Sequence, residues 1–327
     1  MNGRRRALLA AVSGLAFLAS ARGARSQTGA GKRRVAYFSY SSPAAGGRFL
    51  AQFTAGLREL GWIEGSNLML DVRWAQGDAA RYAPLTSELL ALRPDVFVAS
   101  IDYAVLAAAD ATKTVPIVFI NGTDPVGRGL VQSLQRPGGN VTGFATQDSE
   151  LFPKRLALLK EAIPRLKKVG VFTSSQDRLG LDALEDARRK LDLEFVPAVI
   201  DRPEDIDAAF DKFARAGVTG VLDYAAGATT LMARERVAAL AIQHRMAMFG
   251  LPVVADSGVL LAWGYDIPAL FKRAATLVDR ILKGAKPADI PVEQVDVFEL
   301  VVNLRTARAL GIELPRSLML QATRVIE

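Results

Sequence analysis

From residue 33 onward the chain alternates short apolar runs, rich in Val, Ile and aromatic residues, with longer amphipathic stretches. The strands expected in the first half are Arg34–Tyr40, Leu68–Trp74, Asp95–Ser100 and Pro116–Asn121, and the helices between them fall at about 45–60, 79–92 and 103–112. Near-continuous apolar strands separated by helices predict a parallel sheet that is covered by helices on both faces.

Residues 136–140 (RPGGN) interrupt this pattern, because proline lacks a backbone donor and glycine favours turns. A short strand, Val141–Ala145, follows, and the alternation then restarts. Further strands are expected at Lys168–Ser174, Glu194–Ile200, Val218–Tyr224, Ala247–Gly250, Val259–Trp263 and Phe298–Asn303, with helices at 150–163, 178–191, 203–216, 228–245, 268–283 and 304–310. Two successive sets of this kind predict an α/β fold of two doubly wound, Rossmann-like lobes joined by a hinge.

The first 27 residues have the layout of a secretory signal peptide. Arg4, Arg5 and Arg6 precede a 14-residue apolar or small run, Ala7–Ser20, and Ala19-Ser20-Ala21 offers a small-residue cleavage site. An uncleaved membrane anchor is the alternative, although a span needs about 20 apolar residues. The tandem arginines also permit a twin-arginine export route. We therefore expect an exported, periplasmic protein.

Removal of this leader changes the charge balance. The whole chain carries 41 Lys+Arg against 34 Asp+Glu, but five arginines and no acid lie in residues 1–27, so the remainder has 36 against 34. This near-neutral balance argues against nucleic acid as a partner.

The chain has no cysteine and a single histidine, His244. Disulfides, thiolate metal sites and cysteine nucleophiles are thereby excluded, and so is a lipid anchor on an N-terminal cysteine. A site with several histidine ligands cannot be built. We expect no metal and no cofactor, and a protein that is free in its compartment as a monomer.

Several motifs resemble those of one known family. They are GLRELGW (56–62), EGSNL (64–68), RWA (73–75), PIVF (116–119), DPVG (124–127), RPGGNVTG (136–143) and FELVVN (298–303). In this order they resemble the ABC transporter substrate-binding proteins that include tryptophan-binding members, over about residues 33–327.

The resemblance implies a type I periplasmic-binding-protein fold with three crossing segments, and an importer permease and ATPase as partners. Together with the pattern, it assigns residues 33–143 with about 265–290 to lobe 1, and 148–262 with about 295–327 to lobe 2. The chain departs from the family at Thr173–Asp177, where many relatives carry an Asn-Pro-containing loop, so the class of ligand stays open.

Ligands of open parallel sheets meet the loops beyond the carboxyl ends of the strands. The polar and aromatic candidates in the first lobe are Ser39, Tyr40 and Ser42 after the first strand, Ser100, Asp102 and Tyr103 after the third, and Asn121 and Thr123 after the fourth. In the second lobe they are Thr173, Ser174, Asp223, Tyr224, Trp263, Tyr265 and Asp266.

These candidates suit a small molecule such as an amino acid or an aromatic carboxylate. Hydroxyls and free N–H groups suit a carboxylate, aspartates suit an ammonium group, and the aromatic rings supply flat apolar walls. Each candidate also has a structural interpretation. Ser42, Asp102 and Asp124 could cap the next helix. Tyr40 and Tyr103 could cover helix starts, and Trp263 could belong to the core.

Other motifs do not point to catalysis. Gly127-Arg128-Gly129 and Gly138-Gly139 lack the spacing of a phosphate-binding loop, and no G-x-S-x-G elbow occurs. The basic runs Arg234-Glu235-Arg236 and Arg188-Arg189-Lys190 are typical of solvated helix faces.

We therefore expect the solute-binding component of an ABC importer, not an enzyme. Two alternatives on the same fold are an exported sensor that presents its ligand to a membrane receptor and a sugar transferase or epimerase. A cytoplasmic repressor is disfavoured, because residues 1–32 hold a leader in place of a DNA-binding module.

Overall fold

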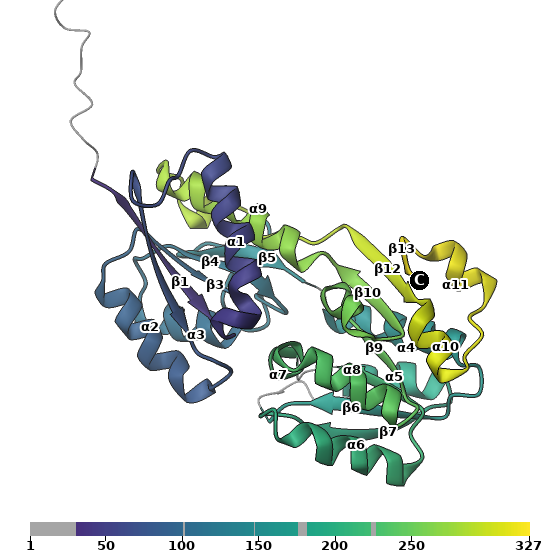
Figure 1. Ribbon diagram of the computed structural model, residues 1–327. Helices are drawn as coiled ribbons and strands as arrows, with labels where there is room; N and C mark the ends of the chain where they lie inside the picture. Colours follow the sequence, from purple (N-terminus) through teal and green to yellow (C-terminus); the bar gives the residue numbers. More distant parts are fainter. Residues whose placement is uncertain (1–30, 101, 147, 176–181, 224–226) are drawn as a thin grey trace, which may run out of the picture. The chain divides into compact units, whose positions relative to one another are not determined.

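Two sheets of mostly parallel strands, each lying between helices, make up the chain from Arg33 to Glu327 (Figure 1). The computed structural model describes residues 31–100, 102–146, 148–175, 182–223 and 227–327, so the predicted leader lies outside the described residues. None of the described helices has the length and apolar character that a membrane span requires. The predicted α/β class with two doubly wound sheets is confirmed.

The first sheet has the strand order β11-β5-β4-β3-β1-β2, and all of its pairings are parallel. Its strands are β1 (Arg33–Ser39), β2 (Leu68–Trp74), β3 (Val96–Ala99), β4 (Ile117–Gly122), β5 (Val141–Ala145) and the short β11 (Glu293–Gln294). The helices that accompany it are α1 (Pro43–Glu59), η2 (Ala79–Arg81), α2 (Tyr82–Ala91), α3 (Asp102–Ala111), α9 (Ile267–Leu282) and η4 (Pro287–Asp289).

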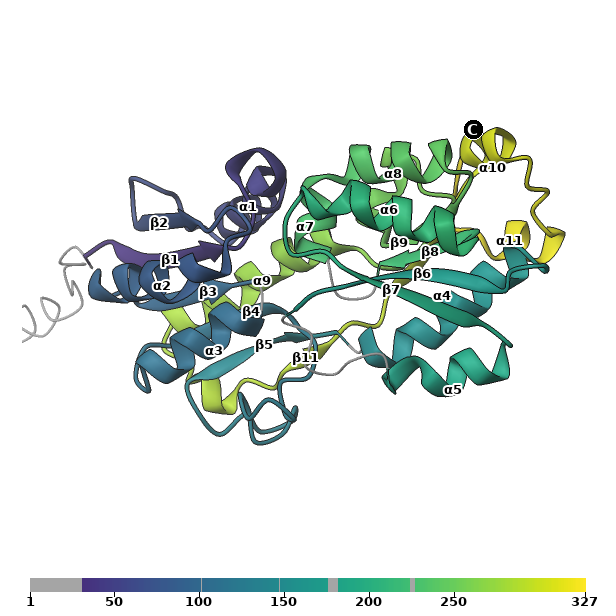
Figure 2. The ribbon, with the colours of Figure 1, turned by 90° about the horizontal axis from the view of Figure 1, so that it is seen from below.

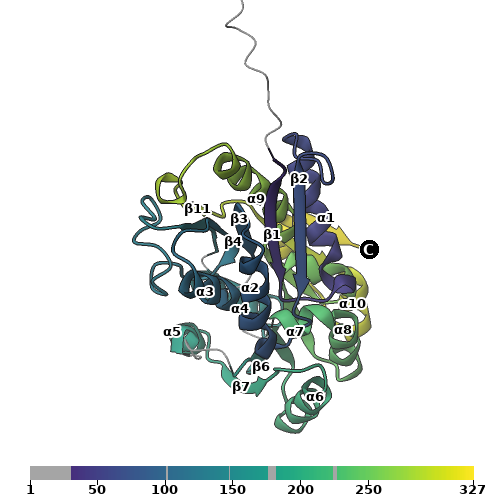
Figure 3. The same ribbon diagram turned by 90° about the vertical axis from the view of Figure 1, so that its left-hand side faces the viewer.

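Alternate residues of each buried strand enter two different cores. In β1, Val35 and Tyr37 pack with Phe53 of α1 and with α9, whereas Ala36 and Phe38 pack toward α2 and α3. Helices α1 and α9 therefore cover one face of the sheet, and α2 and α3 cover the other (Figures 1 and 3). This double burial explains why the strands read as continuous apolar runs.

The second sheet has the order β13-β12-β10-β9-β8-β6-β7. Its strands are β6 (Lys168–Thr173), β7 (Glu194–Val199), β8 (Gly220–Asp223), β9 (Ala247–Gly250), β10 (Leu261–Tyr265), β12 (Phe298–Asn303) and β13 (Arg324–Ile326). The surrounding helices are α4 (Asp148–Ala162), α5 (Asp182–Lys190), α6 (Asp205–Ala216), α7 (Gly227–Met232), α8 (Arg234–Gln243), η3 (Pro252–Ser257), α10 (Leu304–Leu310) and α11 (Arg316–Gln321). Helices α4 and α5 pack on one face, and α6 and α8 on the other (Figure 2).

The chain passes between the two sheets three times. It leaves the first sheet after β5, returns from β10 of the second sheet to α9, and leaves again between β11 and β12. Helix α9 lies beside α1 rather than against the strand that precedes it (Figure 1). Residues distant in sequence thus complete each sheet.

Some elements differ from the expectation. Strand β12 runs antiparallel to β10, with Leu261 opposite Val302 and Tyr265 opposite Phe298, so the second sheet is not wholly parallel. Strand β10 ends two residues later than predicted, which places Tyr265 inside the strand. The single helix expected at 228–245 is divided at Ala233, whose backbone leaves the helical region (φ −105°, ψ 20°). The short elements β11, β13 and α11 were not predicted.

A glycine sets how closely α1 approaches α9. A Cβ atom on Gly56 would lie 2.5 Å from the backbone oxygen of Lys272 and 2.9 Å from the Cβ of Ala275. Neither atom belongs to a flexible side-chain end, so the helices would have to move apart to accommodate it.

We predict that Gly56→Ala lowers the free energy of unfolding by roughly 1–3 kcal/mol, the usual cost of overpacking. Gly47→Ala in the same helix is the matched control, since its Cβ would meet nothing within 4 Å. The control should be neutral or stabilise by up to about 1 kcal/mol, because alanine favours the helix. Urea unfolding of both variants is the measurement, and equal effects would contradict the packing argument.

Candidate functional site

The loop after β1 continues the sheet beyond its last regular pair. The backbone oxygens of Ser39, Tyr40 and Ser41 accept hydrogen bonds from the N–H groups of Ala75 (2.8 Å), Gly77 (2.7 Å) and Gln76 (3.1 Å), respectively. Gln76 and Gly77 adopt positive φ values of 58° and 78° to make this turn. These bonds fix the backbone on which several candidate side chains stand.

Serines 39, 41 and 42 of this loop have different roles. Ser39 is buried, and its Oγ accepts a hydrogen bond from the N–H of Ser41 (3.3 Å). Ser42 caps α1, because its Oγ accepts from the N–H of Ala45 (3.3 Å). The Oγ of Ser41 is buried without a hydrogen-bond partner in the described part of the chain.

The other candidates of the first sheet lie at the ends of β3 and β4. Ser100 is buried directly after β3, and Thr123 is half-buried after β4. The half-buried Tyr103 has the guanidinium of Arg128 5.8 Å from its ring centroid. Asp102 is the first residue of α3, but its side chain lies outside the described structure.

Tyr40, directly after β1, and Tyr82, the first residue of α2, both have raised pKa values. Burial raises the pKa of its phenol to about 12, with further raising by Tyr82 and by Asp223, while Arg48 lowers it. Burial likewise raises the pKa of Tyr82 to about 12. Tyr40 therefore stays a neutral hydroxyl at physiological pH.

In the second sheet, the hydroxyls of Thr173 and Ser174 form hydrogen bonds with β7 and with Asp201 just beyond it. The Oγ1 of Thr173 donates to the backbone oxygen of Ala198 (3.2 Å), and the Oγ of Ser174 donates to Asp201 (3.0 Å). Asp201 also accepts from the N–H of Ser175 (2.9 Å). Although burial opposes it, these hydrogen bonds from Ser175 and Ser174 hold the pKa of Asp201 below its usual value.

Asp223 ends β8 and accepts a hydrogen bond from the hydroxyl of Thr230 in α7. Thr229 donates to the backbone oxygen of Asp201, so α7 is joined to the ends of both β7 and β8. Tyr224, the next candidate, lies outside the described residues.

The end of β10 combines core packing with a bond across the two sheets. The ring of Trp263 stacks on Phe298 at 5.3 Å and an interplanar angle of 19°, and Asp266 caps α9 by accepting from the N–H of Ala269 (3.1 Å). Tyr265 is fully buried, and its hydroxyl donates to the Oδ1 of Asn121 (2.7 Å) at the end of β4.

Further contacts join residues near the carboxyl ends of β1 and β2 to helices of the second sheet. Leu231 of α7 is buried in the apolar cluster that otherwise surrounds α1 and α9. A Cβ on Gly77 would lie 2.5 Å from Met232 Cε, and Nη2 of Arg48 donates to the backbone oxygen of Val253 (3.4 Å). The carboxyl ends of β1 and β2 thus approach α7 and η3 of the second sheet.

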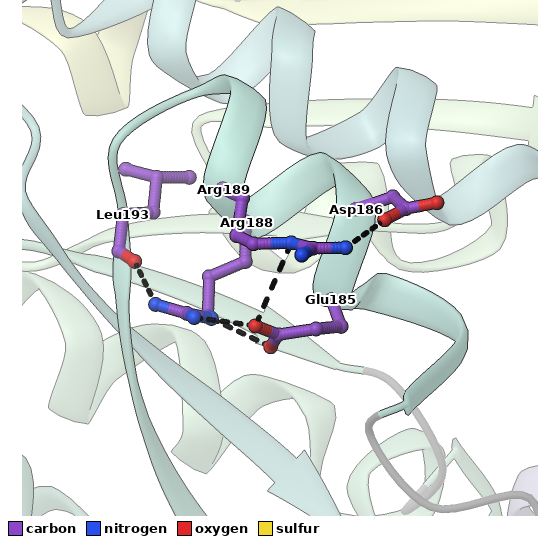
Figure 4. Close-up of polar contacts among 5 residues, drawn as sticks. All are labelled: Glu185, Asp186, Arg188, Arg189 and Leu193. Carbon is purple, nitrogen blue, oxygen red and sulfur yellow. Dashed lines mark hydrogen bonds and ion pairs between the residues drawn. The ribbon is translucent and has the colours of Figure 1, made fainter.

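The basic run at residues 188–190 belongs to a surface network rather than to this site. Figure 4 shows Arg188 pairing with Glu185 and Arg189 pairing with Asp186 on the same helix, while Arg188 Nη1 donates to the backbone oxygen of Leu193 (3.1 Å). The hydrogen bonds that Arg188 donates to Glu185 lower the pKa of Glu185. These arginines have acidic partners on α5, as expected of a solvated helix face.

Sequence reasoning passed over several residues of this region. Ser41 lies in the loop from which Ser39, Tyr40 and Ser42 were chosen but was not itself chosen. The site candidates also did not include Trp74, Arg48, Thr230 or Leu231. Their roles arise from contacts between segments distant in sequence. The sequence did offer two local signals for this region: a predicted strand that ends in Trp74, and the serines at 39, 41 and 42 after the first strand.

Two doubly wound sheets, three chain crossings and polar strand ends on both sides define a two-lobed solute-binding architecture. Comparison with known proteins supports this class of protein. Residues 48–326 match the family model described as ABC transporter substrate binding protein, and the chain belongs to that family. Members bind small molecules outside the cytoplasm for an ABC transporter and are not classed as enzymes.

Three relatives are similar over most of the chain. A tyrosine-binding protein of Clostridioides difficile is 30% identical over 270 residues, which cover 80% of this chain and 76% of the relative. A conserved domain protein of Vibrio cholerae is 28% identical with a TM-score of 0.81, covering 90% of this chain and 99% of its own. An ABC domain of Streptococcus pneumoniae solved with L-Trp is 24% identical with a TM-score of 0.81, covering 90% and 100%. The fold is that of the type I periplasmic binding proteins.

We predict that Asp201→Asn destabilises the protein by up to about 1 kcal/mol at pH 7, because it weakens the charge-assisted bonds from Ser174 and Ser175. Since the pKa of Asp201 is depressed in the folded state, its stabilisation is present above the ordinary carboxyl range and is lost as pH falls through the folded value.

The difference between wild type and variant in urea unfolding should therefore shrink between pH 7 and pH 3. Asp186→Asn, at an exposed position on α5, is a control for a surface carboxylate. A difference that stays constant with pH would contradict this assignment.

Proposed function

We propose that this chain is the periplasmic component of an ABC importer and that it captures an amino acid with an aromatic side chain between its two sheets. The observation that carries this proposal is the contact between α7 and the ends of β1 and β2: Leu231 is buried in the cluster around α1, and a Cβ on Gly77 would lie 2.5 Å from Met232 Cε. A ligand held there touches both halves of the molecule at once.

The chemistry of these groups supports a zwitterion. Buried hydroxyls at the ends of β1 and β3 suit a carboxylate, and Asp223 suits an ammonium group. Tyr40, Tyr103 and Trp74 offer aromatic surface for an apolar side chain. The C. difficile relative is named a tyrosine-binding protein and the S. pneumoniae domain was solved with L-Trp, which supports the same class of ligand.

We infer that each sheet, with its helices, forms one lobe. Lobe 1 comprises residues 33–143 with about 265–290, and lobe 2 comprises residues 148–262 with about 295–327. The three chain crossings after β5, after β10 and before β12 support a hinge at these points. A ligand that contacts both lobes binds the closed arrangement more tightly and shifts the population toward it.

The proposal also covers delivery to the transporter, export and oligomeric state. The closed, loaded form is delivered to a permease and an ATPase, residues 1–27 direct export, and the mature protein acts as a monomer. Capture and release involve no covalent chemistry. The strand ends therefore need hydrogen-bond donors, acceptors and flat walls rather than a nucleophile and its base.

We predict that L-tyrosine or L-tryptophan binds protein that has been unfolded and refolded free of ligand, in isothermal titration calorimetry, and that L-alanine does not. A ligand at about 100 times its Kd should stabilise the fold by about 2.7 kcal/mol. Asp223→Asn should weaken L-tyrosine far more than 3-(4-hydroxyphenyl)propionate, which lacks the ammonium group. Absence of heat and of any shift in melting temperature with all the aromatic amino acids would contradict the proposal.

A further inference from the structure

Ser41 is a buried hydroxyl for which the fold alone gives no use. Its side chain is 2% exposed, and within the described residues its Oγ makes no hydrogen bond. A buried polar atom without a partner costs free energy, so such atoms call for an explanation. Alanine would fill the same space without that cost.

The side chain of Ser41 lies against the first turn of α1. Its Cβ is 3.1 Å from the position that a Cβ on Gly46 would occupy, and Cζ3 of Trp74 is 2.6 Å from the same position. Because Gly46 has no side chain, Ser41 and the indole of Trp74 can both approach the helix start. Figure 3 shows β1 and β2 beside α1.

The start of α1 favours negative charge. This helix is 17 residues long, and no acidic residue occupies its first turn. Its partial positive charge is therefore not compensated by its own side chains. Arg48, about one turn further along α1, adds a positive charge near this end of the helix.

We propose that the hydroxyl of Ser41, at the N-terminus of α1, donates a hydrogen bond to the carboxylate of the bound amino acid and makes this end of the site selective for a carboxylate. A serine hydroxyl can donate or accept, and the positive helix end decides in favour of an anionic acceptor. This inference rests on the proposed function, of which it specifies one end.

The proposal distinguishes Ser41 from a merely structural residue. Removal of its hydroxyl should leave the melting temperature unchanged or raise it, since an unsatisfied group leaves the core. At the same time L-tyrosine should bind roughly tenfold more weakly, as expected for the loss of one charge-assisted hydrogen bond. Structural damage would lower stability and affinity together.

Ser41→Ala is tested by calorimetry with L-tyrosine and with L-tyrosinamide, in which an uncharged amide replaces the carboxylate. The preference for L-tyrosine should fall about tenfold in the variant, whereas Ser41→Cys, similar in size and a weaker donor, should lie between wild type and Ser41→Ala. Thr86→Val is the matched control, because Thr86 also buries a hydroxyl without a hydrogen-bond partner among the described residues, but in α2. This control should keep the wild-type affinity.

The possible outcomes separate the two proposals. If wild type binds neither L-tyrosine nor L-tryptophan, the proposed function fails. If wild type binds but Ser41→Ala keeps its affinity, or loses affinity for L-tyrosine and L-tyrosinamide equally, the proposed role of Ser41 is overturned and the proposed function stands.

Discussion

Parallel strands bring all of their carboxyl ends to one edge of a sheet, and the rest of the structure follows from this constraint. Both sheets place polar groups at that edge, while their central strands are buried on two faces. The bond between Tyr265 and Asn121 joins the two edges where β10 passes the chain on to α9. In the proposed function, one ligand contacts strand ends of both sheets at once, an arrangement that serves capture and release.

The pattern of apolar runs was sufficient to predict the longer strands of both sheets. Strands β2, β5, β9 and β12 have the predicted bounds. The antiparallel direction of β12 could not be predicted from the sequence. Its pairing with β10 depends on a return of the chain over more than thirty residues. Strands β11 and β13 contain two and three residues, and only their pairing partners make them strands.

Prediction of the site was limited for a different reason. The sequence places a polar residue at a strand end but does not decide whether its side chain faces a ligand, the next helix or a neighbouring strand. Ser42 and Asp266 cap helices, and Ser174 is held by Asp201, whose position depends on β7. Tyr265 was expected in a loop and is buried in a strand, because β10 extends two residues further. The sequence could not single out Ser41, because its interest lies in a buried hydroxyl that has no hydrogen-bond partner among the described residues.

The central claim is that one ligand engages strand ends of both sheets at once. Hydrogen–deuterium exchange of the ligand-free and L-tyrosine-saturated protein tests it most directly. The account predicts slower exchange in two segments together, the loop and helix start at residues 39–46 and the segment of α7 at residues 229–232, while the edge strand β13 exchanges equally in both states. Protection confined to one of the two sheets, or spread evenly over the whole chain, would contradict the claim.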